Sequence, residues 1–430
     1  MRRLVPLLIA ATVLAGCDMD YGGEPEPRPA PPPAITRTEL DQHLLALQRI
    51  ANRNGGTRAA GTPGYDASAD YVAARLRDAG WRVRRQAVPF THFTLRSASV
   101  SVNGRALRRE RDFQVLTYSG SGRAAGTLRG IEGGCSPSDF DGLGASDIPL
   151  VPRGGCLTHD KARNAQRAGA RALVVFERVT SPRGVSSATL VIPDIRIPVV
   201  GVSERALDDS AASVRLSVDA DSRRERTQNV IAETRGGAGD RIVMAGGHLD
   251  SVAGGPGIND NGSGVATLIE LAEAIGPKPP GARVRLGFWA AEELALVGSR
   301  RYVSSLTGDE RERIRAYLNF DMVGSPNPVP ELYGDADAGL AKVLRDAAGR
   351  TKLGEAQVGG ASDHAAFEQR GIPVNGLYTG AAERAPGGRP RDPCYHLACD
   401  TERDVNLGIL LRMARITASA VETLSARYAK

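Results

Sequence analysis

Lysine is scarce in this chain of 430 residues, and arginine carries nearly all of its positive charge. The net charge of +6 and the isoelectric point near 9.2 would by themselves allow a nucleic-acid partner. However, the arginine clusters alternate with apolar or acidic neighbours, and neither interleaved aromatics nor an RNP-like run accompanies them. We therefore interpret the basic residues as a solvated surface and expect no nucleic-acid partner. The five lysines are Lys161, Lys278, Lys342, Lys352 and Lys430.

Several sequence motifs are also missing. No G-x-S-x-G motif occurs, which disfavours a serine hydrolase of the α/β type. No two cysteines have the C-x2-C spacing of a zinc finger. There is no internal repeat. With 41% hydrophobic and 24% charged residues, the composition is that of an ordinary globular protein with ample core.

The N-terminus reads "MRRLVPLLIAATVLAGC", a basic start followed by a short apolar run and small residues before a cysteine. This is the layout of an export signal, and the run is too short to span a membrane stably. "LAGC" resembles the lipobox of bacterial lipoproteins, in which Cys17 would become the lipidated first residue. Plain signal cleavage nearby is the alternative. We expect an exported protein in the periplasm or at the cell surface, held to the membrane by its lipid alone.

Four cysteines remain if Cys17 takes the lipid, and export would place them in an oxidising environment. The natural pairs by proximity are Cys135 with Cys156 and Cys394 with Cys399. Four cysteines allow three connectivities, so the sequence alone leaves the pairing open.

Strands and helices alternate along the second half of the chain. "RIVMAGGHLD", "ARVRLGFWAAEE", "IRAYLNFDM" and "GIPVNGLYTG" are apolar strands, and helical segments such as "SGVATLIELAEAI" lie among them. This pattern predicts an α/β fold with a mostly parallel central sheet flanked by helices. Helices are also expected near residues 39–53 and 61–80, and a strand at 81–90.

The middle of the chain differs, with many glycines and short strands such as "SASVSVNG". It contains one strand–helix–strand unit at residues 148–177, and we predict that it is a small β-rich α/β insertion into the larger domain. The predicted organisation is a signal peptide (1–17), a Pro-rich tether (18–36), the first part of the large domain (37–95), the insertion (96–222) and the rest of the large domain (223–430).

Polar residues collect where the predicted strands end, which is where α/β sheets bind ligands. His248 and Asp321 follow strands, Asp260 precedes a helix, Glu293 follows a strand, and His396 lies in a later loop. Taken singly, such an Asp is more often a helix cap and such a His a surface residue. Five together are harder to explain in that way. Two imidazoles and three carboxylates suit two zinc ions with one carboxylate bridging.

Six motifs extend this pattern. In order along residues 228–405, "GGHLDSV", "GINDNGSG", "AAEELALVGS", "LNFDMVGSPNP", "SDHAAF" and "CYHLACDT" closely resemble the secreted bacterial di-zinc aminopeptidases of the Streptomyces and Vibrio type, which have the zinc exopeptidase fold. The middle segment resembles the protease-associated (PA) domain that many members of this family carry as an insertion.

The resemblance implies a role for each matching residue. Asp260 would bridge two Zn²⁺ ions, with His248 and Asp321 completing one site and Glu293 and His396 completing the other. The further roles fall on Glu292 as general base, Tyr395 as the hydroxyl that stabilises the tetrahedral oxyanion, and Asp250 as a hydrogen-bond partner of the His248 imidazole. The family also has a cis peptide after the bridging Asp, here between Asp260 and Asn261.

The function implied is removal of N-terminal residues, large and apolar ones foremost, from peptides with a free N-terminus, by a monomeric enzyme. Two alternatives stay open from the sequence. One is different chemistry on the same metal-binding fold, such as a carboxypeptidase, a dipeptidase or a single-zinc cyclotransferase. The other is a binding protein that keeps both folds without catalysis.

Overall fold

The structure is a computed structural model that describes residues 35–429 except 178–183, 186, 208–211 and 280. The expected signal segment, Cys17 and most of the tether therefore lie outside the described residues. Of the helices that are described, none combines the length and apolar composition needed to cross a membrane.

A seven-stranded portion of the sheet forms the centre of the larger part of the chain, in the order β13-β12-β14-β11-β9-β10-β8. The pairs β9–β10, β9–β11, β11–β14 and β12–β13 are parallel, whereas β8 and β12 each join a neighbour antiparallel. The sheet is thus mostly parallel, as the sequence predicts. The strands are β8 (Ser213–Glu233), β9 (Ile242–His248), β10 (Arg283–Trp289), β11 (Ile314–Phe320), β12 (Glu331–Tyr333), β13 (Gly354–Ala356) and β14 (Val374–Tyr378).

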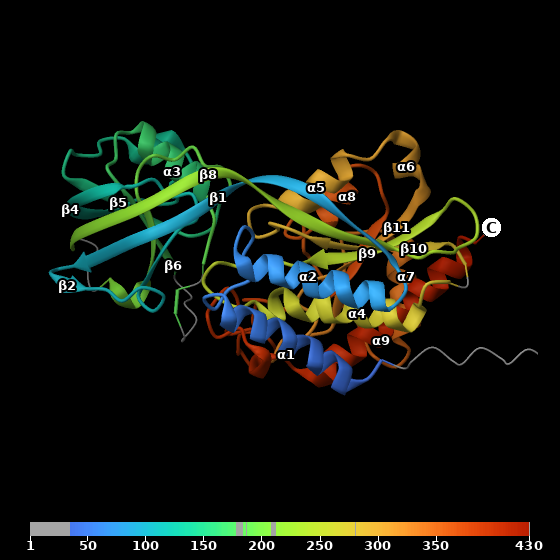
Figure 1. Ribbon diagram of the computed structural model, residues 1–430. Coiled ribbons are helices and arrows are strands. Elements are labelled where there is room, and N and C mark those ends of the chain that lie inside the picture. Colours follow the sequence, from blue (N-terminus) through green and yellow to red (C-terminus); the bar gives the residue numbers. More distant parts are fainter. Residues whose placement is uncertain (1–34, 178–183, 186, 208–211, 280, 430) are drawn as a thin grey trace, which may run out of the picture. The chain divides into compact units, whose positions relative to one another are not determined.

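Helices cover both faces of this sheet (Figure 1). On one side of the strands lie α1 (Arg37–Arg53), α2 (Pro63–Asp78), α4 (Gly264–Ile275), α7 (Ala338–Ala348) and α9 (Leu407–Arg427). On the other lie α5 (Val297–Ser304), α6 (Gly308–Arg313) and α8 (His364–Glu368). The first two helices begin where a threonine side chain, Thr36 or Thr62, accepts a hydrogen bond from a backbone N–H of the first turn.

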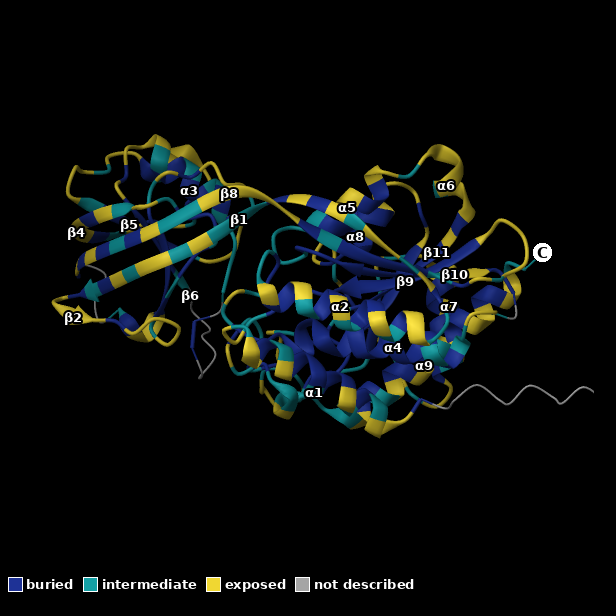
Figure 2. Ribbon diagram, viewed as in Figure 1, coloured by how far each residue is buried: buried dark blue, intermediate teal, exposed yellow. Residues whose placement is uncertain are grey.

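The central strands are mostly apolar and buried because both of their faces are covered (Figure 2). Successive side chains point to opposite faces, so Val243 and Ala245 of β9 enter the core under α4, while Met244 enters the core under α5. Trp289 also lies on the α5 side, and Gly287 makes room for it: a Cβ there would lie 2.1 Å from the indole ring.

The middle of the chain forms a smaller sheet region with its own two cores. Its strands are β1 (Arg82–Val102), β2 (Arg105–Ala106), β3 (Phe113–Val115), β4 (Gly122–Gly130), β5 (Asp147–Pro152), β6 (Leu173–Glu177) and β7 (Val199–Ser203), and its helix is α3 (Thr158–Arg167). The predicted strand–helix–strand unit is present as β5, α3 and β6. The disulfide between Cys135 and Cys156 joins the loop after β4 to the loop before α3, with 5.9 Å between the Cα atoms.

Two long antiparallel strands, β1 and β8, join the two regions (Figure 1). They pair from Arg82 opposite Glu233 to Val102 opposite Val214, with one irregularity between Leu95 and Ser97. We expected "SASVSVNG" to be a separate short strand, and it is instead the far half of β1. The reason is the partner: β8 continues the ladder past the irregularity, which no local pattern reveals. Both predicted boundaries of the insertion fall inside these two strands.

Candidate metal centre

The expected metal ligands lie together at one edge of the sheet. His248 is the last residue of β9, and its neighbours β10 and β11 end just before Glu292–Glu293 and Asp321. Because these three parallel strands end at the same edge, their following residues converge. Asp260 lies in the turn Ile258–Ser263 that precedes α4, and His396 comes from the loop between β14 and α9.

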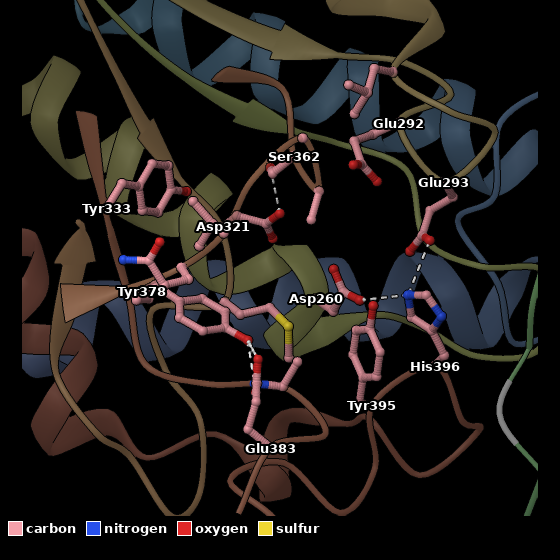
Figure 3. A pocket seen from close by; sticks show the side chains of 18 of the residues that line it. Asp260, Glu292, Glu293, Asp321, Tyr333, Ser362, Tyr378, Glu383, Tyr395 and His396 are labelled. Carbon is pink, nitrogen blue, oxygen red and sulfur yellow. Dashed lines mark hydrogen bonds and ion pairs between the residues drawn. The ribbon is translucent and has the colours of Figure 1, made fainter. Parts of the chain in front are cut away.

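Asp260 stands between two histidines and contacts each with a different oxygen. Its Oδ1 lies 3.1 Å from His248 Nε2, and its Oδ2 lies 3.2 Å from His396 Nε2. Asp321 Oδ1 is 3.2 Å from His248 Nε2, and Glu293 Oε2 is 3.1 Å from His396 Nε2. Figure 3 shows these carboxylates and His396 turned toward one space. Asp260 thus belongs to two triplets, one with His248 and Asp321 and one with Glu293 and His396. Within each triplet the possible ligand atoms lie within 4.8 Å of one another.

The centre contains buried carboxylates whose negative charge bound cations would stabilise. Burial lowers the pKa of His248, but Asp321 and Glu292 outweigh it and raise that pKa well above its usual value. The pKa of His396 rises in the same way, against its burial, because of Glu293 and Asp260. Oε1 of Glu293 is buried and finds no hydrogen-bond partner among the described residues. Imidazole nitrogens and carboxylate oxygens in this arrangement fit zinc ions.

Glu292 lies beside this cluster, with its Oε2 4.0 Å from His248 Nε2. Burial, followed by the charges of Asp363 and Glu293, raises the pKa of Glu292 well above that of an ordinary glutamate. Neither of the two triplets that share Asp260 requires this carboxylate as a ligand.

Asp250 contacts His248 differently from what we expected. The Asp250 backbone carbonyl, rather than its carboxylate, lies 3.0 Å from His248 Nδ1 and can accept its proton. The carboxylate Oδ1 is 3.9 Å from that nitrogen and instead accepts a hydrogen bond from the Glu292 backbone N–H at 3.1 Å. Asp250 thus helps to place the turn that carries Glu292 as well as the His248 ring.

A second set of buried groups, none of them expected there from the sequence, fixes the turn around Asp260. The Asp400 carboxylate accepts hydrogen bonds from the backbone N–H groups of Asn259 and Asp260, at 2.6 and 3.0 Å. The fully buried Arg58 donates to the carbonyls of Leu249, Pro256 and Gly257 in the loop between β9 and this turn. The peptide bond between Asp260 and Asn261 is cis, as expected.

A chain of hydrogen bonds reaches Asp321 from the core under α5. Trp289 Nε1 donates to the Tyr317 hydroxyl, and that hydroxyl donates to Asn319 Oδ1, both at 2.8 Å. Asn319 Nδ2 then donates to Ser362 Oγ, and Ser362 donates to Asp321 Oδ2 at 2.7 Å. Every second residue of β11 faces the same side of the sheet. A Tyr-x-Asn-x-Asp spacing at the end of a predicted strand is therefore a sequence signal that could have revealed these hydrogen-bonded side chains.

His396 is held by the inserted region. The Ser187 carbonyl lies 3.2 Å from His396 Nδ1, and the Ser187 N–H donates to the His396 carbonyl at 3.2 Å. A hydrogen bond at Nδ1 fixes which way the ring points and leaves Nε2 facing Asp260 and Glu293. Tyr395 stacks on the same ring, with 3.8 Å between the ring centroids. The disulfide between Cys394 and Cys399 closes the short loop that carries both residues.

The site opens into a cavity of about 540 Å³. At the end away from Glu292, Tyr333 and Tyr378 line it, and Tyr378 donates a hydrogen bond to Glu383 (Figure 3). Met322 also lines the cavity. His364, which follows Ser362-Asp363 in the sequence, does not line this cavity; its Nε2 lies 2.7 Å from the Gly359 carbonyl.

Comparisons with known proteins place this fold and site in a family. The model of peptidase family M28 matches residues 229–421, and that of the PA domain matches residues 125–209. The chain belongs to peptidase family M28, with a PA domain inserted before the matched segment, and is a hydrolase of peptide bonds.

Among its relatives is an aminopeptidase of Pseudomonas aeruginosa, 36% identical over 87% of this chain and 78% of the relative. A probable lipoprotein aminopeptidase of Mycobacterium tuberculosis, LpqL, is 38% identical over 85% of this chain and 80% of its own length. Among solved structures, a zinc aminopeptidase from Bacillus subtilis superposes with a TM-score of 0.74 at 26% identity, covering 90% of this chain and 95% of that one.

Proposed function

We propose that this chain is an aminopeptidase that uses two zinc ions. The observation that carries the proposal is Asp260, whose two oxygens each face one pair made of a histidine and a carboxylate. His248 and Asp321 would hold one zinc with Asp260, and Glu293 and His396 would hold the other. The relatives named aminopeptidase, and the related B. subtilis structure named a zinc aminopeptidase, support this assignment.

Bound zinc would supply Lewis acidity, polarising a carbonyl oxygen and making water more acidic. The residues of the chain do the rest. Glu292 accepts the proton of the attacking water and delivers it to the leaving amine, a task suited to a carboxylate whose pKa burial has raised. Tyr395, held against the His396 ring, directs its hydroxyl toward the oxyanion that forms at the scissile carbonyl.

The cavity supports a free N-terminus as the recognised group. Its wall near the zinc ligands is acidic, which favours a positively charged amine and disfavours a blocked one. Met322 and the rings of Tyr333 and Tyr378 provide apolar surface for a large apolar N-terminal side chain. A carboxypeptidase would need a cation near the zinc ligands for the substrate carboxylate. Two arginines line this cavity: Arg391 is paired with Glu331, and Arg300 is an exposed residue of the wall that this cavity shares with a second one.

We further propose that the protein is an exported, monomeric lipoprotein anchored through Cys17, with the organisation expected from the sequence. The lipobox-like "LAGC", the two disulfides and the relative named a probable lipoprotein aminopeptidase support export and anchoring. Metabolic labelling with a palmitate analogue tests the anchor: wild-type protein should be labelled, and Cys17→Ala protein should not.

The catalytic assignment is tested with Glu292→Gln. Elemental analysis should find two zinc ions per chain in both wild type and variant, while kcat for release of leucine from an unblocked peptide falls by about 10²- to 10⁴-fold. Glu312→Gln, at an exposed position on α6, is the matched control and should keep full activity. Full activity of the zinc-loaded Glu292→Gln protein would refute the role of Glu292. Equal hydrolysis of an N-acetylated peptide would refute aminopeptidase specificity.

A further inference from the structure

A second cavity continues the active-site cavity on the side of Glu292 and Glu293. Its volume is about 690 Å³, and it lies between residues 191–192 of the PA insertion, the segment from Leu294 to Ser304, and the end of α8. Val191, Ala295 and Arg300 line both cavities. The two cavities therefore meet at these three residues, and a peptide that extends from the zinc ligands on this side would enter the second cavity.

The charge changes sign between the two cavities. Seven carboxylates line the active-site cavity, whereas no Asp or Glu of the described chain lines the second one. The second cavity has Arg300, Arg301 and Arg370 instead. All three side chains are exposed, and none makes an ion pair with another described residue. The seven carboxylates are Asp260, Glu292, Glu293, Asp321, Glu331, Glu355 and Glu383.

Between these arginines the cavity is lined by apolar residues, and the backbone of one of them is strained. Ile192 is 44% exposed, so its apolar side chain is accessible from the cavity that it lines. Val191 has a φ of 68°, a left-handed conformation that a β-branched residue rarely adopts. Its N–H donates to Thr189 Oγ1 at 2.9 Å, within the same turn. The strained turn thus presents Val191 and Ile192 at the junction of the two cavities, where an extended chain could pack against them.

We propose that the second cavity binds the part of a peptide substrate downstream of the cleaved bond, and that its three arginines favour aspartate or glutamate there. The proposal rests on the aminopeptidase function proposed above. A peptide with a positive amine at one end and acidic residues beyond the scissile bond matches the change from acidic to basic walls. The PA insertion would then take part in substrate selection through Val191 and Ile192.

The test uses two peptide amides with free N-termini, Leu-Ala-Ala-Asp-Asp-Ala and Leu-Ala-Ala-Lys-Lys-Ala. In wild type at low salt, kcat/KM for leucine release should favour the acidic peptide by about ten-fold, the size expected of two exposed ion pairs, and the ratio should shrink at high salt. In the double variant Arg301→Glu/Arg370→Glu the ratio should fall to about one or reverse. Because each ratio is taken within one protein, differences in zinc content cancel.

Arg412→Glu, at an exposed position on α9, is the matched control and should keep the wild-type ratio. The dissociation constants of both peptides are also measured by calorimetry with Glu292→Gln protein, so that the result does not depend on turnover. A wild-type ratio within about two-fold of one in both measurements, or a ratio unchanged in the double variant, overturns the proposal. Hydrolysis of leucine p-nitroanilide is followed in parallel: its absence in wild type would count against the aminopeptidase function, whereas equal binding of the peptides would count against the cavity.

Discussion

Arg58 offers a sharp test of how the metal centre is held, because one side chain supports the loop between two zinc ligands. It is fully buried and donates to the carbonyls of Pro256 at 2.8 Å, and of Leu249 and Gly257 at 2.5 Å each. His248 lies directly before this loop, and Asp260 follows it. Replacing Arg58 by Met keeps much of the side-chain volume and removes all three donors.

Two opposing terms set the size of the effect. Three buried carbonyls that lose a charged donor cost about 2 kcal/mol each, or about 6 kcal/mol in total. Burial lowers the pKa of Arg58 to about 10 from 12.5, despite the nearby carboxylates of Asp400, Asp250 and Asp260. That shift indicates that roughly 3 kcal/mol of charge-burial cost disappears with the guanidinium. We therefore expect Arg58→Met to lower the free energy of unfolding by about 3 kcal/mol, and Arg58→Lys, which keeps the charge but not the fork of donors, by less.

The measurement is urea unfolding of the zinc-free proteins at 25 °C, followed by tryptophan fluorescence, together with zinc affinity by chelator competition. Zinc should bind the Met variant about 10- to 100-fold more weakly, because the loop orients two of its ligands. Arg53→Met, at the exposed end of α1, is the control and should change stability by less than about 0.5 kcal/mol. An Arg58→Met protein with unchanged stability and unchanged zinc affinity would refute the reasoning.

Three further predictions concern the same region. Ser187→Pro removes the N–H that donates to the His396 carbonyl, so it should weaken zinc binding by about ten-fold in a competition titration. Ser187→Ala keeps that hydrogen bond and should leave zinc binding unchanged. Equal effects of the two variants would show that the backbone contact is unimportant. Removing zinc with a chelator should lower the melting temperature, and free zinc at 100 times its dissociation constant should restore about 2.7 kcal/mol of stability. A melting temperature that does not depend on zinc would contradict a site formed only in the folded protein. Burial lowers the pKa of His364 below 6.5, so the folded state resists protonation of this side chain and the unfolded state does not. The free energy of unfolding should therefore fall as the pH drops below 6.5, and it should fall less in His364→Asn. Identical pH profiles of stability for the two proteins would contradict this prediction.

The expectations that came from local periodicity agree with the structure. The apolar runs that end at His248, Trp289 and Phe320 are parallel strands, and the helix at Gly264–Ile275 lies among them as predicted. The side chains expected as ligands converge because parallel strands carry their following residues to one edge. Both disulfides join the cysteines that are close in sequence, which settles a pairing that the sequence left open.

Expectations that depended on contacts between distant segments fared less well. The separate strand expected at "SASVSVNG" is part of β1, because β8 extends the ladder across it. Asp250 meets His248 through its carbonyl rather than its carboxylate. Arg58 lies in the loop between α1 and α2 with no motif around it, and its carbonyl partners are more than 190 residues away in the sequence.

By itself the sequence determined the sheet and the kinds of side chain at its edge, because strand periodicity and ligand chemistry can both be read over a few residues. Only the tertiary structure decided how those side chains are oriented. Asp260 faces both histidines because Asp400 binds the backbone of its turn, and His396 is fixed by Ser187 from the inserted domain. These hydrogen bonds join segments separated by 140 residues or more, and burial at the shared edge makes each of them necessary.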